Sequence, residues 1–192
     1  FTEGTGHVDD HALAYLQGAR AEGMPTGAYH YFLPKYDPIE QAEHFLATMA
    51  AIEEQAGQLM LPPVLDVEVK ASAAVLQKTI LQFLEHVEKV RSITPILYTS
   101  PGFWRSYAGR WEACVRFPLW VAHYGASYPS QFYPWVRWHF WQYTSAGRVP
   151  GVAGNVDLNL FPGTWLDLLR LCHSGAEPEY RVQDTQIGRA HV

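Results

Sequence analysis

Two acidic side chains, Asp66 and Glu68, stand two residues apart in the segment "LPPVLDVEVK", residues 61–70. The rest of the segment is rich in strand-forming residues, and successive side chains of a strand point to opposite faces. Both carboxylates should therefore point the same way, with their Cα atoms ~6–7 Å apart. Like charges at this separation raise at least one of the two pKa values, which makes a proton donor available near neutral pH.

This arrangement fits the cleavage of a glycosidic bond, in which one acid protonates the leaving oxygen and another supports the cationic sugar. The alternative is that the acids pair with lysine or arginine, or lie in water at a strand end. Their apolar neighbours Leu65, Val67 and Val69 argue against this alternative. Acids at the carboxyl ends of barrel strands are also usually functional. The backbone spacing is compatible with both retaining and inverting hydrolysis.

Two further acids, Asp157 and Glu3, occur in strand-like segments. Asp157 stands in "NVDLN", an apolar and β-rich setting, although Asp and Asn also form turns. Glu3 ends the first visible strand, "FTEG". Each residue alone is weak evidence for a site, so both are candidates only together with Asp66 and Glu68.

Aromatic residues make up 14% of the chain, and several stand at strand ends. Tyr29 and Tyr31 share one face of the strand in "GAYHYF", and the residues that alternate with them share the other. Trp120 and Tyr124 share a face in "LWVAHYG", and Gln142 opposes its neighbours in "FWQYT". Taken singly, most such aromatics are core residues. Around a carboxylate cluster, they are what a sugar-stacking groove needs.

Composition limits the remaining classes of function. The 192 residues carry a formal net charge of −5 without a lysine or arginine cluster, which argues against a nucleic-acid partner. No stretch is long and apolar enough to span a bilayer. The two cysteines, Cys114 and Cys172, fit no metal or redox spacing.

Strand-like and helix-like segments alternate along most of the chain. We expect strands at 1–4, 27–34, 62–69, 94–100, 118–125, 139–145 and 155–161, and helices at 9–23, 37–57, 72–92, 101–111 and 163–172. Asp9 or Asp10 should cap the first helix, and Asp37, followed by Pro38, should cap the second. The buried stripe of the third helix should be Leu76, Ile80, Leu84 and Val87.

This order predicts an α/β fold with a parallel sheet, most economically a barrel. Seven strands at most are visible, whereas a closed barrel of this type needs eight. We expect residues 1–173 to form one barrel domain and 174–192 to be a disordered tail. The last six residues, "IGRAHV", match the translation of a common sequencing-library adapter, so we interpret them as a sequencing or cloning artefact.

The ordered series "FTEGTGHVDDHALAYLQGARAEGMPTGAYHYFLP", "PPVLDVEV", "PILYTS", "PLWVAHYG" and "FWQYTSAGRVPGVAGNVDLNLF" resembles the family 25 glycoside hydrolases, which are lysozymes, or N-acetylmuramidases. The resemblance implies a modified TIM-like (β/α)5(β)3 barrel. It also implies cleavage of the β-1,4 bond between N-acetylmuramic acid and N-acetylglucosamine in peptidoglycan, with no metal or organic cofactor. The partner would be peptidoglycan glycan strands, and the protein a monomer that is secreted or directed to the cell wall.

By the same resemblance, Glu68 matches the proton donor and Asp66 its partner acid, which stabilises an oxazolinium or the cationic transition state. Asp157 matches the acid of the family's final strand, and Glu3 that of its "TEG" motif. The positions that line the family's saccharide groove correspond to Tyr29, Tyr31, Tyr98, Trp120, Tyr124 and Gln142.

One part of the family pattern is missing. The family opens on a strand of the form G-[IV]-D-[VI]-S, whose Asp belongs to the active site, and nothing in this sequence matches it. We therefore expect the second and last strands of the barrel to present unpaired edges. The chain as written should be unstable or aggregate, with little activity.

Two other functions compete with a muramidase. A chitinase is disfavoured, because "VLDVEV" supplies only D-x-E without the further upstream Asp residues of the chitinase pattern. A catalytically impaired peptidoglycan- or glycan-binding module is the second alternative. A pure binder has no need for three mutually repelling acids, and Asp66, Glu68 and Asp157 are all present.

Overall fold

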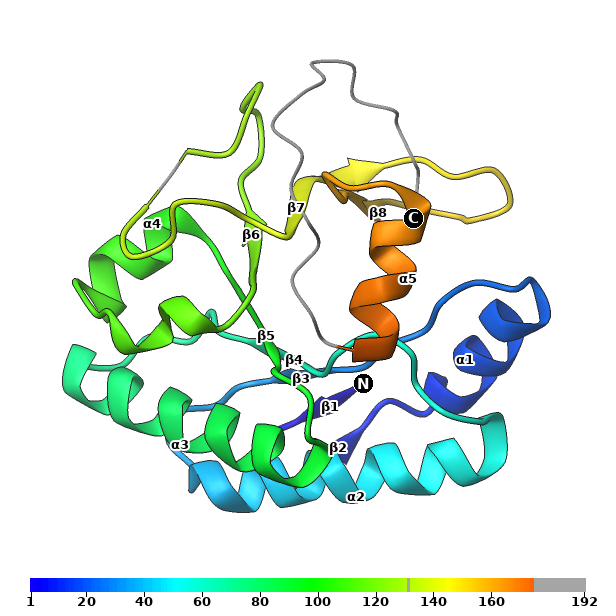
Figure 1. Cartoon of the computed structure of the whole chain (residues 1–192), viewed down its shortest axis with the longest axis horizontal. Helices are drawn as coiled ribbons and strands as arrows, with labels where there is room; N and C mark the ends of the chain where they lie inside the picture. The colour runs from blue at the N-terminus through cyan, green and yellow to red at the C-terminus, as the bar shows by residue number, and fades with distance from the viewer. Residues whose placement is uncertain (131, 175–192) are drawn as a thin grey trace.

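The chain folds around one mixed β-sheet of eight strands (Figure 1). The computed structural model describes residues 1–130 and 132–174. The strands are β1 (Thr2–Glu3), β2 (His7–Val8), β3 (Tyr29–Tyr31), β4 (Val64–Asp66), β5 (Ile96–Thr99), β6 (Leu119–Ala122), β7 (Phe140–Gly147) and β8 (Val156–Leu160). The helical elements are α1 (Ala12–Ala21), α2 (Pro38–Ala56), α3 (Ala73–Arg91), α4 (Pro101–Phe103), the π turn η1 (Trp104–Ala108), the 3-10 turn η2 (Ala113–Arg116) and α5 (Trp165–Ser174).

The sheet has the strand order β2-β1-β3-β4-β5-β6-β7-β8. Strands β1 and β3 to β7 are parallel to their neighbours, whereas β2 and β8 run antiparallel to β1 and β7. Helices connect the parallel strands up to β6, but the described part of segment 123–139 before β7 contains no helix. The predicted α/β class, with strand–helix units followed by strands alone, is therefore confirmed.

Two expectations about the strands need correction. The sequence suggested seven strands at most, and the described residues form eight, because His7–Val8 pairs with Thr2–Glu3 in a short hairpin. A two-residue strand leaves no alternation pattern to detect. We expected the outer edge of β1 to be unpaired, but it pairs with β2. The outer strands of the described sheet are β2 and β8.

Local sequence signals explain where the helices begin and end. Asp37 caps α2, and its carboxylate accepts hydrogen bonds from the backbone N–H groups of Ile39 and Glu40. Gly57 ends this helix with a φ of +80°, a conformation that glycine adopts at little cost. For α1 the expected cap is wrong. The N-cap is His11, and Asp9 instead accepts a hydrogen bond from the backbone N–H of His11.

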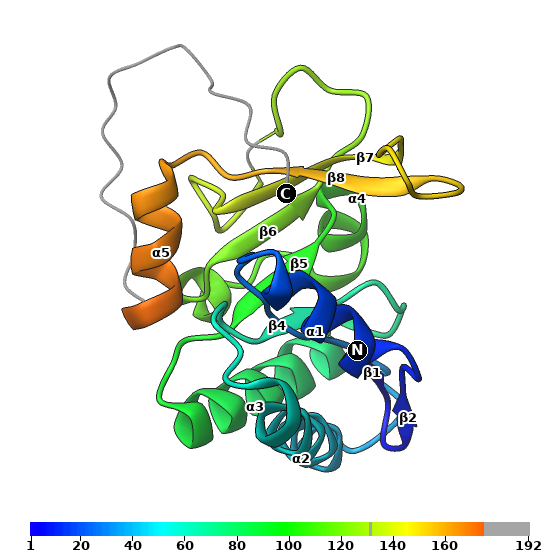
Figure 2. The same ribbon diagram turned by 90° about the vertical axis from the view of Figure 1, so that its right-hand side faces the viewer.

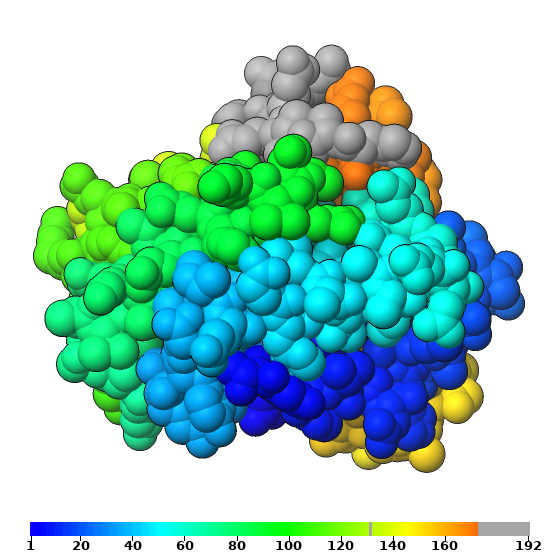
Figure 3. Space-filling view, turned by 90° about the horizontal axis from the view of Figure 1, so that it is seen from below, coloured from blue at the N-terminus to red at the C-terminus, as the bar shows by residue number. Residues whose placement is uncertain are grey.

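Helices α2 and α3 pack side by side and cover one face of the molecule (Figures 1 and 3). The β7–β8 hairpin lies at the opposite end, and α5 stands between the hairpin and the level of α3 (Figures 1 and 2). The predicted stripe of α3 is fully buried at Leu76, Ile80, Leu84 and Val87, as expected. Across residues 1–130 and 132–174, no helix combines the length and apolar character needed to cross a bilayer.

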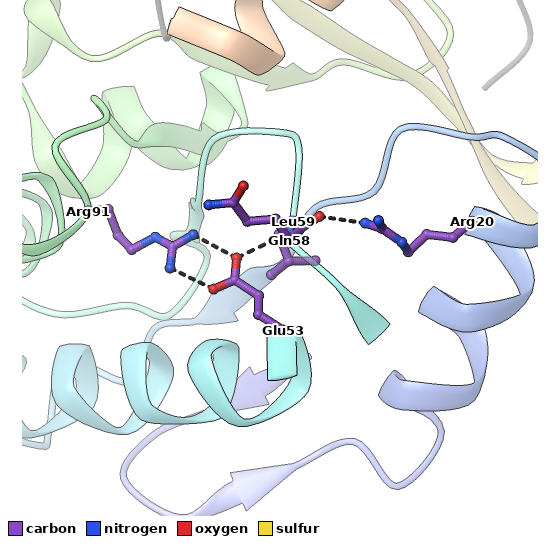
Figure 4. Close-up of polar contacts among 5 residues, drawn as sticks. All are labelled: Arg20, Glu53, Gln58, Leu59 and Arg91. Atoms are coloured by element: carbon purple, nitrogen blue, oxygen red, sulfur yellow. Dashed lines mark hydrogen bonds and ion pairs between the residues drawn. The ribbon is translucent and has the colours of Figure 1, made fainter. Parts of the chain in front are cut away.

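Hydrogen bonds from two sides hold the segment between α2 and β4 (Figure 4). Arg91 donates two hydrogen bonds to the Glu53 carboxylate, and the same carboxylate accepts one from the backbone N–H of Leu59. From the other side, Arg20 donates to the carbonyl oxygen of Gln58. These contacts stabilise the connection that leads into β4, the strand that ends at Asp66.

Ser174 is the last residue of α5. The predicted disordered tail and its adapter-like end therefore lie almost wholly outside the described residues.

Candidate active site

Five of the candidate residues lie in one row across the sheet. The strand register pairs Glu3 with Tyr31, Tyr31 with Asp66, Asp66 with Tyr98, and Tyr98 with Trp120. The row crosses five strands, and its members come from positions up to 117 residues apart, the difference between 3 and 120. The fold therefore brings the two acidic motifs and three of the aromatic candidates to one line at the carboxyl ends of parallel strands.

Asp66 and Glu68 stand together at the centre of this row. Strand β4 ends at Asp66, but the backbone bonds continue, because Val67 N donates to Tyr98 O at 2.9 Å. Val67 is fully buried between them, whereas Asp66 is half-buried and Glu68 is exposed. The alternation predicted from the sequence holds, so both carboxyl groups lie on one face.

The electrostatic surroundings of Asp66 favour its protonated form. Burial raises the pKa of Asp66 well above its usual range, and the charge of Glu68 and a hydrogen bond between the two carboxyl groups raise it further. The Oδ1 atom of Asp66 is buried and has no hydrogen-bond partner in the described part of the chain. A buried carboxyl group beside another acid is a typical source of a proton near neutral pH.

Tyr29 and Tyr31 flank the acids on β3. Burial raises the pKa of the Tyr31 hydroxyl, and the charges of Glu68, Asp66 and Glu3 raise it further. For Tyr29, burial again acts first, followed by the charges of Asp66, Asp9 and Asp157. Both rings therefore face the acidic cluster, on the side of β3 that the sequence pattern indicated.

On the other side of the acids, two tyrosines meet one amide. The Tyr98 hydroxyl donates a hydrogen bond of 2.8 Å to Oε1 of Gln142, and the Tyr124 hydroxyl donates to the same oxygen. Burial raises the pKa of Tyr98, and the neighbouring charges, Glu68 first, add to the shift. The predicted candidates Tyr98, Tyr124 and Gln142 therefore form one hydrogen-bonded group next to Glu68.

Trp120 is the last residue of the row, and it contacts Asn159, a residue that the sequence analysis did not name. Its ring packs edge-on against Tyr98, with centroids 5.5 Å apart, and its indole N–H donates to Oδ1 of Asn159 at 2.9 Å. Asn159 is paired in register with Gln142 across β7 and β8. A sequence signal did exist, because Asn159 stands two residues after Asp157 and so shares its face of the strand.

Asp157 is exposed on β8 and acts on the same group of side chains. After burial and the hydrogen bond with Tyr98, its charge is the next influence on the pKa of Tyr124, and it raises that pKa. It also raises the pKa of Tyr29 from the other side of the site. The charges of Asp157 and of the acid pair thus act on the same two tyrosines, Tyr29 and Tyr124.

A buried polar network joins β1, β3 and α2 next to the row, and no sequence pattern indicated it. His30 is fully buried, and its Nδ1 lies 2.8 Å from Thr2 Oγ1 while its Nε2 lies 3.3 Å from Gln41 Oε1. Its ring stacks on Phe83 with centroids 5.0 Å apart. Burial lowers the pKa of His30 to about 4, so the residue is neutral and joins β1, β3 and α2 as a structural link.

An apolar cavity of about 190 Å³ begins beside the row. Tyr29, Trp120 and Asn159 belong to its wall, which continues to Trp165 and Leu168 of α5. Val64 also belongs to this wall and lies two residues before Asp66, on the same face of β4.

The chain matches the family described as Glycosyl hydrolases family 25 over residues 1–152. The fold, the acid pair and this match together place it in one class of protein: the chain belongs to the family 25 glycosyl hydrolases.

Relatives and solved structures agree with this assignment. The chain is 39% identical over 166 residues to the YegX protein of Escherichia coli (strain K12), covering 85% of this chain and 57% of that protein. It is 32% identical over 185 residues to Lysozyme M1 of Streptomyces globisporus, covering 91% of this chain and 62% of that protein. The crystal structure of the bacterial lysozyme from Streptomyces coelicolor superposes with a TM-score of 0.81 at 30% identity, over 91% of this chain and 84% of that one. The chain thus spans about three fifths of the length of these two curated relatives.

Proposed function

We propose that the chain hydrolyses the β-1,4 bond between N-acetylmuramic acid and N-acetylglucosamine in peptidoglycan. The Asp66–Glu68 pair carries this proposal: two carboxyl groups in contact, at the carboxyl end of a strand, with the pKa of Asp66 raised by burial and by Glu68. The lysozymes of Streptomyces globisporus and Streptomyces coelicolor, to which the chain is similar, support the same class of substrate. A protein with this substrate acts outside the cytoplasm, so we also propose that it is secreted or directed to the cell wall.

Glu68 would be the proton donor, because it is the exposed member of the pair and can reach the glycosidic oxygen. The hydrogen bond between the carboxyl groups gives the shared proton a route from Asp66 to Glu68. Glu68 then transfers this proton to the leaving oxygen as the bond to the anomeric carbon breaks. Asp66, left as a carboxylate, stabilises the positive charge that develops on the sugar or on its acetamido group.

Water completes the reaction. It adds to the anomeric carbon and returns one proton to Glu68, which restores the starting state of the pair. The half-buried position of Asp66 suits its part, because a carboxylate partly removed from water stabilises a cation more strongly than one in water.

The surrounding residues would bind the glycan strand. Tyr29 and Tyr31 face the acids from β3, while Trp120 lies on the other side of the row, fixed by Asn159. Aromatic faces at this position suit the stacking of sugar rings. The exposed acids Glu3 and Asp157 at either side suit hydrogen bonds to sugar hydroxyl groups.

The test is the loss of turbidity of a bacterial cell-wall suspension, run with the wild-type chain and with Glu68→Gln. In keeping with the little activity expected above, we expect weak but measurable lysis by the wild type and a loss of about 10²-fold or more for the variant, while binding to pelleted walls is unchanged. Glu54→Gln is the matched control, because Glu54 is exposed on α2, far from the acids. Walls that are bound but not lysed by the wild type would instead favour the glycan-binding module.

A further inference from the structure

The side chain of Gln142 is held by two hydrogen bonds to the same oxygen atom. It lies on β7 with 6% of its surface exposed, and its Oε1 accepts hydrogen bonds from the hydroxyl groups of Tyr98 and Tyr124. Tyr98 belongs to β5, and Tyr124 follows β6. Donors from two separate elements therefore converge on one amide oxygen and fix the orientation of the side chain.

The backbone around Gln142 is fixed as well. Its carbonyl oxygen accepts a hydrogen bond of 3.1 Å from His123 N, and the neighbouring Trp141 indole donates to His123 O at 2.9 Å. A register shift between Gln142 and Thr144 follows directly, and such bulges often re-aim side chains beside active sites. Both the backbone and the side-chain amide of Gln142 are thus held in one orientation.

The amide nitrogen of Gln142 is thereby left available. Nothing in the described part of the chain accepts a hydrogen bond from it, yet it is not among the buried atoms that lack a partner. It therefore reaches solvent. With Oε1 occupied by two phenols, Gln142 can offer an incoming ligand only N–H donors.

The charges nearby decide which acceptor these donors can bind. Glu68 and Asp66 act on Tyr98, and Asp157 and Glu68 act on Tyr124, so the amide lies within a cluster of negative charges. Such a field disfavours an anionic group of the ligand. A neutral acceptor remains, and the carbonyl oxygen of an N-acetyl group is the strongest neutral acceptor on an N-acetylated glycan.

We infer that Tyr98 and Tyr124 are positioning residues that orient Gln142, and that the Gln142 amide nitrogen selects for an N-acetyl carbonyl group of the saccharide. This inference rests on the proposed function, whose groove it refines. If the two tyrosines only stacked on sugar rings, their aromatic rings would matter. We infer instead that their hydroxyl groups matter, because these orient Gln142.

The tyrosine hydroxyl groups can be removed without removing the rings. In Tyr98→Phe and Tyr124→Phe the stacking surface stays, while the bond to Gln142 and the hydrogen bond between the two tyrosine hydroxyl groups are lost. In Gln142→Glu the acceptor for both phenols stays and the N–H donor is lost. Tyr15→Phe is the matched control, since Tyr15 lies exposed on α1. Thermal unfolding of each variant separates loss of fold from loss of recognition.

The probe is N,N′,N″-triacetylchitotriose, compared with cellotriose, which is also neutral and β-1,4-linked but carries hydroxyl groups in place of the acetamido groups. Calorimetric titration gives a dissociation constant for each ligand. Their ratio measures preference for the N-acetyl group, and a general weakening of the fold would not change it. We expect the wild type and Tyr15→Phe to prefer chitotriose.

Each tyrosine variant should lower this preference by about three- to tenfold, the effect of one neutral hydrogen bond. Gln142→Glu should lower it at least as much. In the Gln142→Glu background, Tyr98→Phe should cause little further loss, because the tyrosine acts through the amide. Tyrosine variants with the wild-type preference, fully additive losses, or a wild type that binds neither sugar would each overturn the inference. Cell-wall lysis by the wild type would still stand as separate support for the proposed function.

Discussion

Asp66 and Glu53 are both half-buried carboxylates, but their surroundings are opposite. Glu53 accepts hydrogen bonds of 2.8 and 2.7 Å from Arg91 and one of 3.0 Å from Leu59 N (Figure 4). Asp66 has a buried oxygen without a partner in the described chain, and the side chain beside it is another acid, Glu68. The charge of Glu53 is thus neutralised by Arg91, whereas Asp66 has an acid, Glu68, in place of a cation.

The pKa values follow this difference. Burial alone would raise the pKa of Glu53, but the hydrogen bonds from Arg91 and Leu59 lower it below its usual value. For Asp66, burial and Glu68 act in the same direction and raise the pKa. The fold can therefore satisfy a half-buried acid where the role is structural. At Asp66 it leaves one unsatisfied, which is the pattern expected of a catalytic group.

The largest expected effect concerns activity at Asp66. Asp66→Asn removes the charge that we propose stabilises the sugar cation, so the rate of wall lysis should fall about 10²-fold or more. Glu53→Gln should leave the rate per folded molecule unchanged. Initial rates of turbidity loss, normalised to the folded fraction, measure both. Equal losses for the two variants would remove the distinction between a catalytic and a structural acid.

The second effect concerns stability at Glu53. Arg91→Met leaves the Glu53 carboxylate without its cation, which should lower the free energy of unfolding by about 2–3 kcal/mol, somewhat less than for a fully buried pair. Denaturant unfolding near neutral pH measures this loss. The control is Glu54→Gln, one residue along α2 at an exposed position, where a change within about 0.5 kcal/mol is expected. A similarly small change for Arg91→Met would contradict the structural role of the pair.

The third effect is a difference in the pH dependence of stability. Because the pKa of Glu53 is lowered on folding, its contribution is present above its unfolded pKa and is lost as pH falls. Because the pKa of Asp66 is raised, its contribution is full below its unfolded pKa and is lost as pH rises. Glu53→Gln should thus flatten the stability profile at pH values below the usual pKa of a glutamate, whereas Asp66→Asn should flatten it between about pH 4 and about pH 8. The same slope change in both variants would be inconsistent with the opposite shifts.

The smallest expected effect concerns His30, a fully buried polar side chain that, unlike Asp66, has hydrogen-bond partners. Thr2→Val removes the hydroxyl that contacts His30 Nδ1 and should lower the free energy of unfolding by about 1 kcal/mol. Because the pKa of His30 is lowered to about 4, its contribution is present above pH 6.5 and is lost as pH falls toward 4. Unfolding measured at pH 7 and pH 5 checks both statements. No loss at pH 7 would show that the contact does not stabilise β1.

Several parts of the site could be predicted because they depend on local periodicity. Alternation along one strand placed Asp66 and Glu68 on one face, and it separated Tyr29 and Tyr31 from His30. The cap at Asp37 likewise needs only its neighbours in sequence.

Other parts depend on distances between strands, which local patterns do not encode. The row from Glu3 to Trp120 follows from the register of five strands, and that register is set by packing and connection geometry. The contacts of His30 with Thr2 and Gln41, and of Trp120 with Asn159, join residues 11 to 39 positions apart. Alternation can mark the face on which a single residue such as Asn159 lies, but a single sequence does not indicate which residue of another element it contacts.

The most direct test of the account is the chemical identity of the new chain ends after purified peptidoglycan is digested with the wild-type chain. Mass spectrometry of reduced products distinguishes the two β-1,4 bonds of the glycan strand. We expect fragments with N-acetylmuramic acid at the reducing end, and we expect these fragments to be absent from digests with Glu68→Gln. Fragments ending in N-acetylglucosamine, or the same products from the variant, would contradict it.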